Sequence, residues 1–208
     1  MPIEIDNFEL LKSLVDPQSE DDYWLVELIG RKKDWPDLLK SQQHFGSYFI
    51  TSQRMLSALE AEIKARCKLN HARAYLYPSP KSKKKTALAL MKKLLSEVEC
   101  DDFTGLFGSM TSASAECSAQ RGRKLFVLDC DDLKAPLEEA AREVISLVKT
   151  CKTSLSQPRE PIVAPTPNGF HILASPFDTL EFSREANLLK TCTCEVKHSS
   201  PTVLCFFG

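Results

Sequence analysis

The sequence predicts a mixed α+β fold, because its expected strands and helices follow one another without regular alternation. The apolar run Leu125–Leu128 is short and rich in β-formers, as in a buried strand, although its length alone does not exclude a buried helical turn. The segment from about Gln53 to Cys67 carries apolar residues at helical spacing. Asn168-Gly169 between two β-rich runs is a strong hairpin signal. Together these observations favour α+β over a doubly wound sheet.

The composition is that of a globular protein with a sizeable core. The chain has 208 residues, of which 43% are hydrophobic and 26% charged, enough for one domain or a domain with a small appendage. We expect an N-terminal α/β extension over residues 1–70 and a main unit over residues 71–208, together in one compact globule. The net charge of −1 does not indicate nucleic-acid binding, so any such affinity requires a local basic patch.

The lack of a visible secretion signal and the spacing of the cysteines favour an intracellular protein. The first residues are acidic and lack the apolar stretch of a secretion signal, and no apolar run approaches transmembrane length. We therefore expect a cytoplasmic protein without a membrane partner. The eight cysteines contain no C-x-x-C pair, which favours reduced, buried thiols. Cys192 and Cys194 lie close together, but their spacing supports zinc binding only weakly.

The elements expected before the central run begin with an irregular N-terminus. Residues 1–40 are predicted to be helical, with an interruption at Pro17 and a second apolar set over 23–29. The basic run Arg31–Lys33 is interpreted as a solvated helix end, with a phosphate contact as the alternative. The following elements are a strand over Phe45–Ile50, a helix over about Gln53–Cys67 capped by Thr51 or Ser52, a strand over His71–Pro78, a basic turn over Pro78–Lys85, a helix over about Thr86–Val98 and a loose connection over 99–121.

The elements expected after the central run begin with a convincing helix. Pro136 opens this helix, which extends to about Lys152 and has glutamates in its first turn and lysines in its last turn, as the helix dipole favours. The remaining elements are strands over Ile162–Ala164 and Phe170–Ala174, a short helix over about Phe182–Leu189 and a last strand over Pro201–Phe207.

Two carboxylates, Asp129 and Asp131, follow the central run directly. In a strand they project to the same face, with Cys130 on the opposite face. Carboxylates crowded in this way repel each other unless a cation lies between them, so the pair favours a divalent metal, Mg²⁺ or Mn²⁺. Asp132 is better explained as the end of the strand and a cap of the next helix.

A histidine, His171, lies within the apolar strand FHIL, where a single imidazole is by default a hydrogen-bonded core or surface residue. The expected topology changes this interpretation. The helix over 136–152 packs on the sheet and brings the chain back to its starting end, so the hairpin that carries His171 can lie beside the strand that carries Asp129. The imidazole and the carboxylates would then share one cleft, where the ring can bond a nucleotide phosphate.

These motifs resemble those of the archaeo-eukaryotic primase superfamily, the primase–polymerases. The first family motif is an apolar strand ending in Asp-x-Asp, matched by LFVLDCD up to Asp131, and the second is a small residue, a spacer and histidine, matched by GFH at His171. The resemblance implies an RRM-like βαββ catalytic unit, in which Asp129 and Asp131 bind catalytic metal ions and His171 contacts the phosphates of the incoming nucleotide. It also implies a nucleotidyltransferase that acts on nucleoside triphosphates and a DNA or RNA template.

The third family motif, another carboxylate on a later strand, has no clean match in this chain. Glu195 and Asp178 are the candidates, although each is better explained as a solvated residue, and we place Glu195 with Asp129 and Asp131 as a metal ligand. A helical extension and a zinc-binding motif are also missing from the sequence. The resemblance is therefore to a reduced or divergent member, and it alone suggests a phage or mobile element as the source.

Positive charge is concentrated in a few stretches that we expect to bind triphosphate or template. These residues are Arg73, Lys81, Lys83, Lys84, Lys85, Arg121 and Arg123. Tyr75 and Tyr77, on the same strand face as Arg73, are expected to stack on bases. The lysine run is more typical of a solvated loop, which makes Arg73 the more informative residue.

Two other functions would use the same residues. A metal-dependent nuclease would use the carboxylates with water as the attacking group, and a non-catalytic RNA- or DNA-binding domain would keep the sheet and the basic loop. Two-histidine phosphoesterases are set aside, because Arg73 and Leu173 occupy the positions where that family needs a hydroxyl. The sequence contains no P-loop, no dinucleotide-binding glycine motif, no H-E-x-x-H and no G-x-S-x-G.

Overall fold

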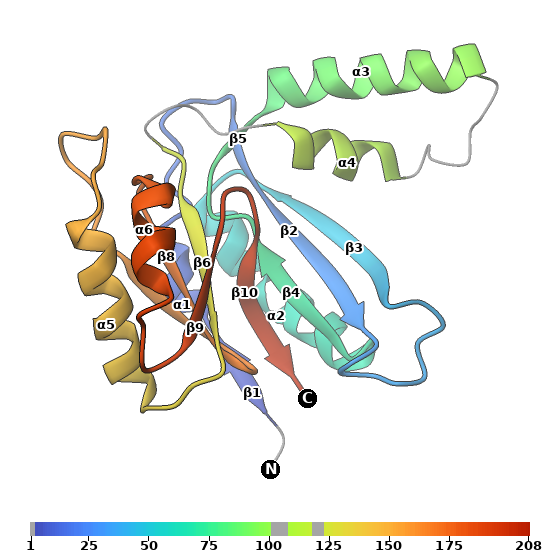
Figure 1. Ribbon diagram of the computed structural model, residues 1–208. Helices are drawn as coiled ribbons and strands as arrows, with labels where there is room; N and C mark the ends of the chain where they lie inside the picture. The colour runs from blue at the N-terminus through green and yellow to red at the C-terminus, as the bar shows by residue number, and fades with distance from the viewer. Residues whose placement is uncertain (1–2, 101–107, 118–122) are drawn as a thin grey trace.

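The computed structural model describes residues 3–100, 108–117 and 123–208, which form two antiparallel sheets with helices around them (Figure 1). This confirms the mixed α+β fold. The larger sheet has the order β1-β10-β4-β2-β3, with β5 paired to β2, and the smaller sheet has the order β7-β8-β6-β9. The strands of the larger sheet are β1 (Glu4–Asp6), β2 (Asp22–Arg31), β3 (Gln42–Ile50), β4 (Ala72–Leu76), β5 (Lys81–Ser82) and β10 (Thr202–Phe207). Those of the smaller sheet are β6 (Phe126–Asp131), β7 (Ile162–Thr166), β8 (Gly169–Ala174) and β9 (Thr193–Lys197).

Six helices accompany the sheets in the described part of the chain. They are α1 (Phe8–Lys12), α2 (Gln53–Leu69), α3 (Lys83–Cys100), α4 (Ser109–Glu116), α5 (Leu137–Thr150) and α6 (Thr179–Ala186). Figure 1 shows α5 and α6 on the side of the smaller sheet that faces away from the larger one, and α3 and α4 as a pair that projects beyond both sheets. None of the helices within the described ranges is long and apolar enough to cross a bilayer.

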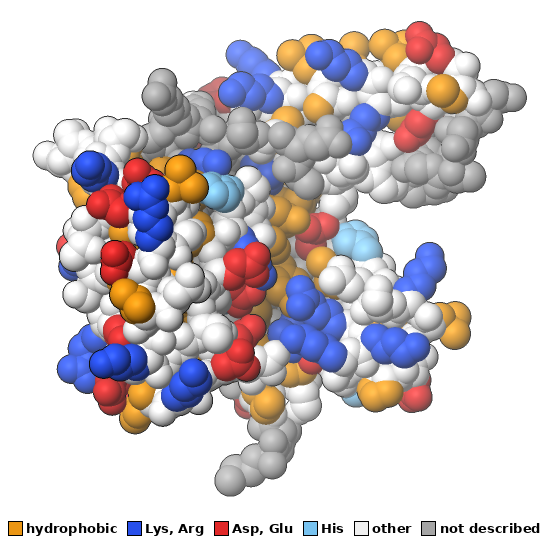
Figure 2. Space-filling view, in the orientation of Figure 1, with side chains coloured by type: hydrophobic (Ala, Val, Ile, Leu, Met, Phe, Trp, Pro, Cys, Tyr) orange, Lys and Arg blue, Asp and Glu red, His pale blue; other side chains and the backbone are white. Residues whose placement is uncertain are grey.

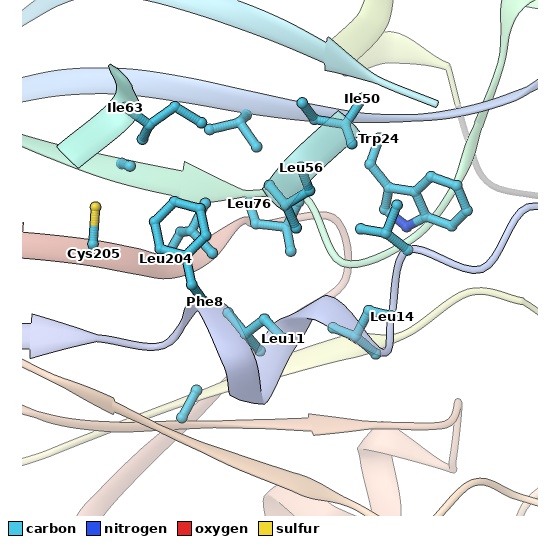
Figure 3. Close-up of a cluster of buried hydrophobic side chains, with 14 of the residues drawn as sticks. Phe8, Leu11, Leu14, Trp24, Ile50, Leu56, Ile63, Leu76, Leu204 and Cys205 are labelled. Carbon is cyan, nitrogen blue, oxygen red and sulfur yellow. The ribbon is translucent and has the colours of Figure 1, made fainter. Parts of the chain in front are cut away.

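The side chains of β6 divide between two hydrophobic clusters, as the period of a strand requires. Val127 belongs to the cluster that packs beneath the larger sheet, whereas Leu128 and Cys130 belong to the cluster beneath α5 and α6. Asp129 and Asp131 therefore continue the row of Val127 on the face that looks toward the larger sheet. Figure 3 shows the first cluster, in which side chains from α1, α2 and the larger sheet meet.

The second apolar set of the N-terminal region is a strand, so the expectation of helical structure there was wrong. Strand β2 pairs with β3 on one side and with β4 on the other, and eight of its first nine residues, all but Ile29, are buried. When both faces of a central strand are buried, its sequence is a nearly continuous apolar run. Such a run lacks the alternation of apolar and polar residues that identifies a half-exposed strand.

Three smaller expectations also differ from the structure. Helix α4 lies within the segment expected to be a loose connection, of which residues 101–107 and 118–122 lie outside the described part. Helix α6 begins and ends three residues earlier than expected. Asp132 follows directly after Asp131, the last residue of β6, and does not cap α5, whose N-cap is Pro136; instead Asp132 Oδ2 accepts a hydrogen bond of 3.1 Å from Thr193 Oγ1.

The predicted boundary at residue 70 falls inside the larger sheet. Strands β1, β2 and β3 precede it and β4, β5 and β10 follow it, yet β4 lies between β2 and β10 through continuous backbone pairing. The N-terminal segment therefore supplies half of the scaffold against which the later strands pack.

Candidate functional site

A cavity of about 160 Å³ lies between the two sheets. Its wall on the smaller sheet carries acidic groups, and its wall on the larger sheet carries basic ones; Figure 2 shows acidic and basic side chains facing each other across the hollow. The charged residues that line it, together with the histidine, are Arg31, Lys33, Arg73, Asp129, Asp131, His171 and Lys197. Strand ends and loops that lie far apart in the sequence thus meet at one place.

Asp129 is held by side chains from both neighbouring strands. It is paired in register with His171 on β8 and with Glu195 on β9, so the three side chains project to the same face. The Nε2 atom of His171 lies 3.1 Å from Asp129 Oδ1, and Lys197 Nζ donates a hydrogen bond to Asp129 Oδ2. Both carboxylate oxygens therefore have a cationic or N–H partner.

These partners make Asp129 a persistent anion. The hydrogen bond from His171, followed by that from Lys197, holds the pKa of the Asp129 carboxyl well below its ordinary value, although burial acts to raise it. On its other side, the His171 ring is fixed by a 3.0 Å hydrogen bond between Nδ1 and the buried Thr202 hydroxyl of β10. The imidazole thus links the acidic strand to the larger sheet.

The hairpin that carries His171 approaches the acidic strand closely because Gly169 has no side chain. A Cβ atom at this position would lie 2.0 Å from the carbonyl oxygen of Cys130 and 3.2 Å from Asp131 Oδ1. Gly169 is paired with Thr166 at the end of β7, so it starts β8 directly after the turn. The glycine is therefore required by the closeness of two backbones next to the carboxylate pair.

The third candidate carboxylate, Glu195, lies on the same face of the sheet as Asp129 but is not part of a metal-binding cluster. Glu195 lies opposite Asp129, yet its side chain is 76% exposed and its nearest ion-pair partner is Lys197 at 3.7 Å. Within the described ranges, no group of three or more His, Cys, Asp or Glu side chains is arranged to hold a metal ion. The other candidate, Asp178, caps α6 by accepting hydrogen bonds from the amides of Leu180 and Glu181.

The basic wall of the cavity comes from β2, the turn after it and β4. Arg73 is fixed there by Asp34, which accepts hydrogen bonds of 2.7 Å from Nε and 2.6 Å from a terminal nitrogen. Partial burial, together with the nearby charges of Arg73 and Arg31, lowers the pKa of Lys33. The buried Nε of Arg31 and the buried hydroxyl of Tyr75 have no hydrogen-bond partner of good geometry. The larger sheet therefore brings several positive charges to the cavity that also contains the carboxylates of Asp129 and Asp131.

Other residues expected to bind nucleotides do not line this cavity. Lys81 is buried and donates hydrogen bonds to the carbonyls of Ser114, at 2.6 Å, and Cys117, at 3.3 Å, so it holds α4. Arg123 is paired with Asp22, and Lys83 lies at the start of α3. Arg73 and Tyr75 do reach the cavity. Arg121 lies outside the described residues.

Two basic parts of the site, the end of β2 with its following turn and Lys197, were not predicted from the sequence. The run Arg31–Lys33 is predicted to be a solvated helix end, but Arg31 ends β2 and Lys33 lies in the turn after it, and both line the cavity. Lys197 was not considered, although the alternation of Glu195 and Lys197 along a strand places both on the face of Asp129.

The eight cysteines are free thiols; six of them are buried as expected, whereas Cys194 is half-buried and Cys100 is exposed. Comparison with known proteins adds no assignment, since no family model matches the chain and neither a curated protein nor a solved structure is similar to it.

Proposed function

We propose that the cavity binds the phosphates of a nucleoside triphosphate and that the protein is a metal-dependent nucleotidyltransferase of the primase–polymerase type, acting on DNA or RNA. The observation that carries the proposal is the convergence of Asp129, Asp131 and His171 with a separate basic wall in one cavity. Polymerase chemistry needs both walls, because carboxylates bind the metal and cations bind the phosphates. The order β6-α5-β7-β8 is compatible with the RRM-like unit that the resemblance implies.

The carboxylates fit Mg²⁺ or Mn²⁺ even without a complete protein cage. Mg²⁺ is commonly held by one or two carboxylates together with substrate phosphates and water, so Asp129 and Asp131 suffice when the nucleotide supplies the other oxygens. Glu195, on the same face, is the further ligand proposed from the sequence. The bound ions would lower the pKa of a 3′-hydroxyl and offset charge on the α-phosphate.

The remaining cavity residues would orient the substrate. Lys33 and Arg31 line the same cavity as the carboxylates and would bind the outer phosphates. His171, fixed between Asp129 and Thr202, can donate a hydrogen bond without a large movement. Lys197 offsets the charge of Asp129 in the free protein, and this ion pair must loosen before Asp129 can bind a metal through Oδ2.

The direct test is synthesis of labelled product from labelled nucleotides on single-stranded templates with Mn²⁺ or Mg²⁺. We expect Asp131→Asn to reduce synthesis by about 100-fold, since metal stabilisation of transition-state charge contributes several kcal/mol. Lys33→Ala should weaken nucleotide binding, whereas Lys152→Ala, at an exposed lysine that does not line the cavity, should leave both synthesis and nucleotide binding unchanged. Loss of labelled strand instead of synthesis would indicate a nuclease, and undiminished activity in Asp131→Asn would contradict the proposal.

A second candidate function, a non-catalytic RNA- or DNA-binding domain, is favoured by one observation. Each oxygen of Asp129 already has a partner within the protein, His171 on Oδ1 and Lys197 on Oδ2. In that case the carboxylate serves the fold, and the basic wall alone serves the ligand. This function predicts no synthesis under any condition, and oligonucleotide binding, measured by fluorescence anisotropy, that persists in Asp129→Ala but is lost in Lys33→Ala.

A further inference from the structure

Helix α3 presents an apolar stripe to solvent on the side away from the sheets. Leu88, Met91, Leu95 and Val98 are each between 59% and 62% exposed. They follow one another at spacings of three and four residues, which is the pattern of a coiled-coil seam. Figure 2 shows hydrophobic and basic side chains side by side along the projecting helical pair.

The inner side of the same helix is held largely by polar contacts. Thr86 is buried and lies 2.7 Å from the hydroxyl of Tyr23, and Lys93 donates a 2.9 Å hydrogen bond to Ser112 of α4. A surface helix normally buries its apolar stripe and exposes its polar face. The reverse arrangement leaves a continuous apolar surface of the kind that marks an interaction site.

The charges beside the stripe indicate what covers it. Exposed Lys84 and Lys85 lie at the N-terminal end of α3, and exposed Glu99 lies at its C-terminal end. If a second α3 lies antiparallel across the stripe, the lysines of each copy face Glu99 of the other. A parallel arrangement would bring lysines against lysines and Glu99 against Glu99, which is unfavourable.

We propose that α3 is a self-association element through which two copies of this chain pair antiparallel. A two-fold axis between Met91 and Leu95 places Leu88 of one copy beside Val98 of the other, so the four apolar side chains are self-complementary. Lys92 also lies near this axis, so the Lys92 side chains of the two copies lie close together and their like charges oppose pairing. Because the apolar seam is single and short, we expect a small interface that forms a weak, reversible dimer.

Sedimentation equilibrium of the full chain tests the pairing. We expect wild type to dimerise reversibly as its concentration rises to about 1 mM, the range in which weak interfaces associate. Leu95→Ser should abolish the dimer, whereas Leu188→Ser, which replaces an equally exposed leucine after α6, should not. Thermal denaturation checks that both variants are folded. A wild type that stays monomeric overturns the proposal, even if the stripe binds anionic vesicles, and so does a dimer that survives Leu95→Ser.

Charge reversal tests the antiparallel orientation. Lys85→Glu alone and Glu99→Lys alone each place like charges opposite one another twice, so each should raise the dimer dissociation constant about tenfold. An equimolar mixture of the two variants should recover wild-type association, because in the mixed dimer the two substituted side chains face each other with opposite charges, and so do the two unchanged ones. Single variants that associate as wild type does, or a mixture that associates no better than they do, would overturn the antiparallel arrangement. The readout is association alone, so it is independent of the proposed catalytic function.

Discussion

Asp129 connects the smaller sheet, the larger sheet and the cavity through its two oxygens. One oxygen meets His171, whose other ring nitrogen meets Thr202, and the second oxygen meets Lys197. These contacts join β6 to its two neighbours and, through the imidazole, to β10. The side chain is 23% exposed, so the ion pairs are partly screened by solvent and their contribution to stability is moderate.

The lowered pKa of Asp129 predicts a particular dependence of stability on pH. A carboxyl group whose pKa is depressed in the folded state stabilises it fully above the unfolded value, about 4, and loses this contribution as the pH falls through the folded value. Asp129→Asn should therefore cost about 1–2 kcal/mol at neutral pH and progressively less in acid. Urea denaturation at several pH values measures the difference.

Asp131→Asn is the matched control for this prediction. Its carboxylate has Lys33 nearby but makes no direct ion pair with another described residue, so the substitution should change stability by less than about 0.5 kcal/mol. A stability deficit of Asp129→Asn that stays constant from neutral to acidic pH would contradict the proposed role of the ion pairs.

Lys197 competes with any metal for Asp129. We expect Lys197→Met to raise the affinity of the nucleotide-free protein for Mn²⁺ by about fivefold, because it removes a positive charge next to the carboxylate and frees Oδ2. Calorimetric titration measures the change. Lys152→Met, at an exposed lysine after α5, should have no effect. An unchanged or weaker affinity in Lys197→Met would indicate that Asp129 does not bind the metal.

The β7–β8 hairpin is the element whose position decides whether His171 reaches the acidic strand. Gly169→Ala would place a methyl group 2.0 Å from the Cys130 carbonyl, so the hairpin would have to move away. We expect a loss of stability of more than about 3 kcal/mol, as in severe overpacking. Chemical denaturation measures this loss and compares it with that of the control Gly108→Ala, where the added Cβ meets no atom within 4 Å. Similar stabilities of the two variants would contradict the close-approach explanation.

The elements predicted correctly are those with a strong local signal. Ser52 caps α2 by accepting a 3.1 Å hydrogen bond from the Met55 amide, and the apolar stripe of α2 begins directly after it. The hairpin at Gly169 and the strand before Asp129 also follow from local residues. Strand β2 was missed because burial on both faces removes its periodicity, and with it the position of Arg31.

At the scale of the whole molecule, the cavity exists because distant segments share a sheet. Strand β10, near the C-terminus, pairs with β1 near the N-terminus and with β4 in the middle of the chain. This order brings Val203 and Tyr75 to the cavity beside Arg31. Such pairings leave no local trace in a sequence, so the acidic residues and Arg73 could be predicted from local patterns, but the position of Arg31 and Lys33 beside them could not.

The most direct test of the account is a crystal structure of the protein with Mn²⁺ and a non-hydrolysable nucleoside triphosphate, with the metal located by its anomalous scattering. We predict a manganese peak within coordination distance of Asp129 and Asp131, with the triphosphate directed toward Lys33 and Arg31. A metal and nucleotide bound elsewhere, for example over the lysines at the start of α3, or an Asp129 that keeps both His171 and Lys197 while the cavity holds neither ligand, would contradict it.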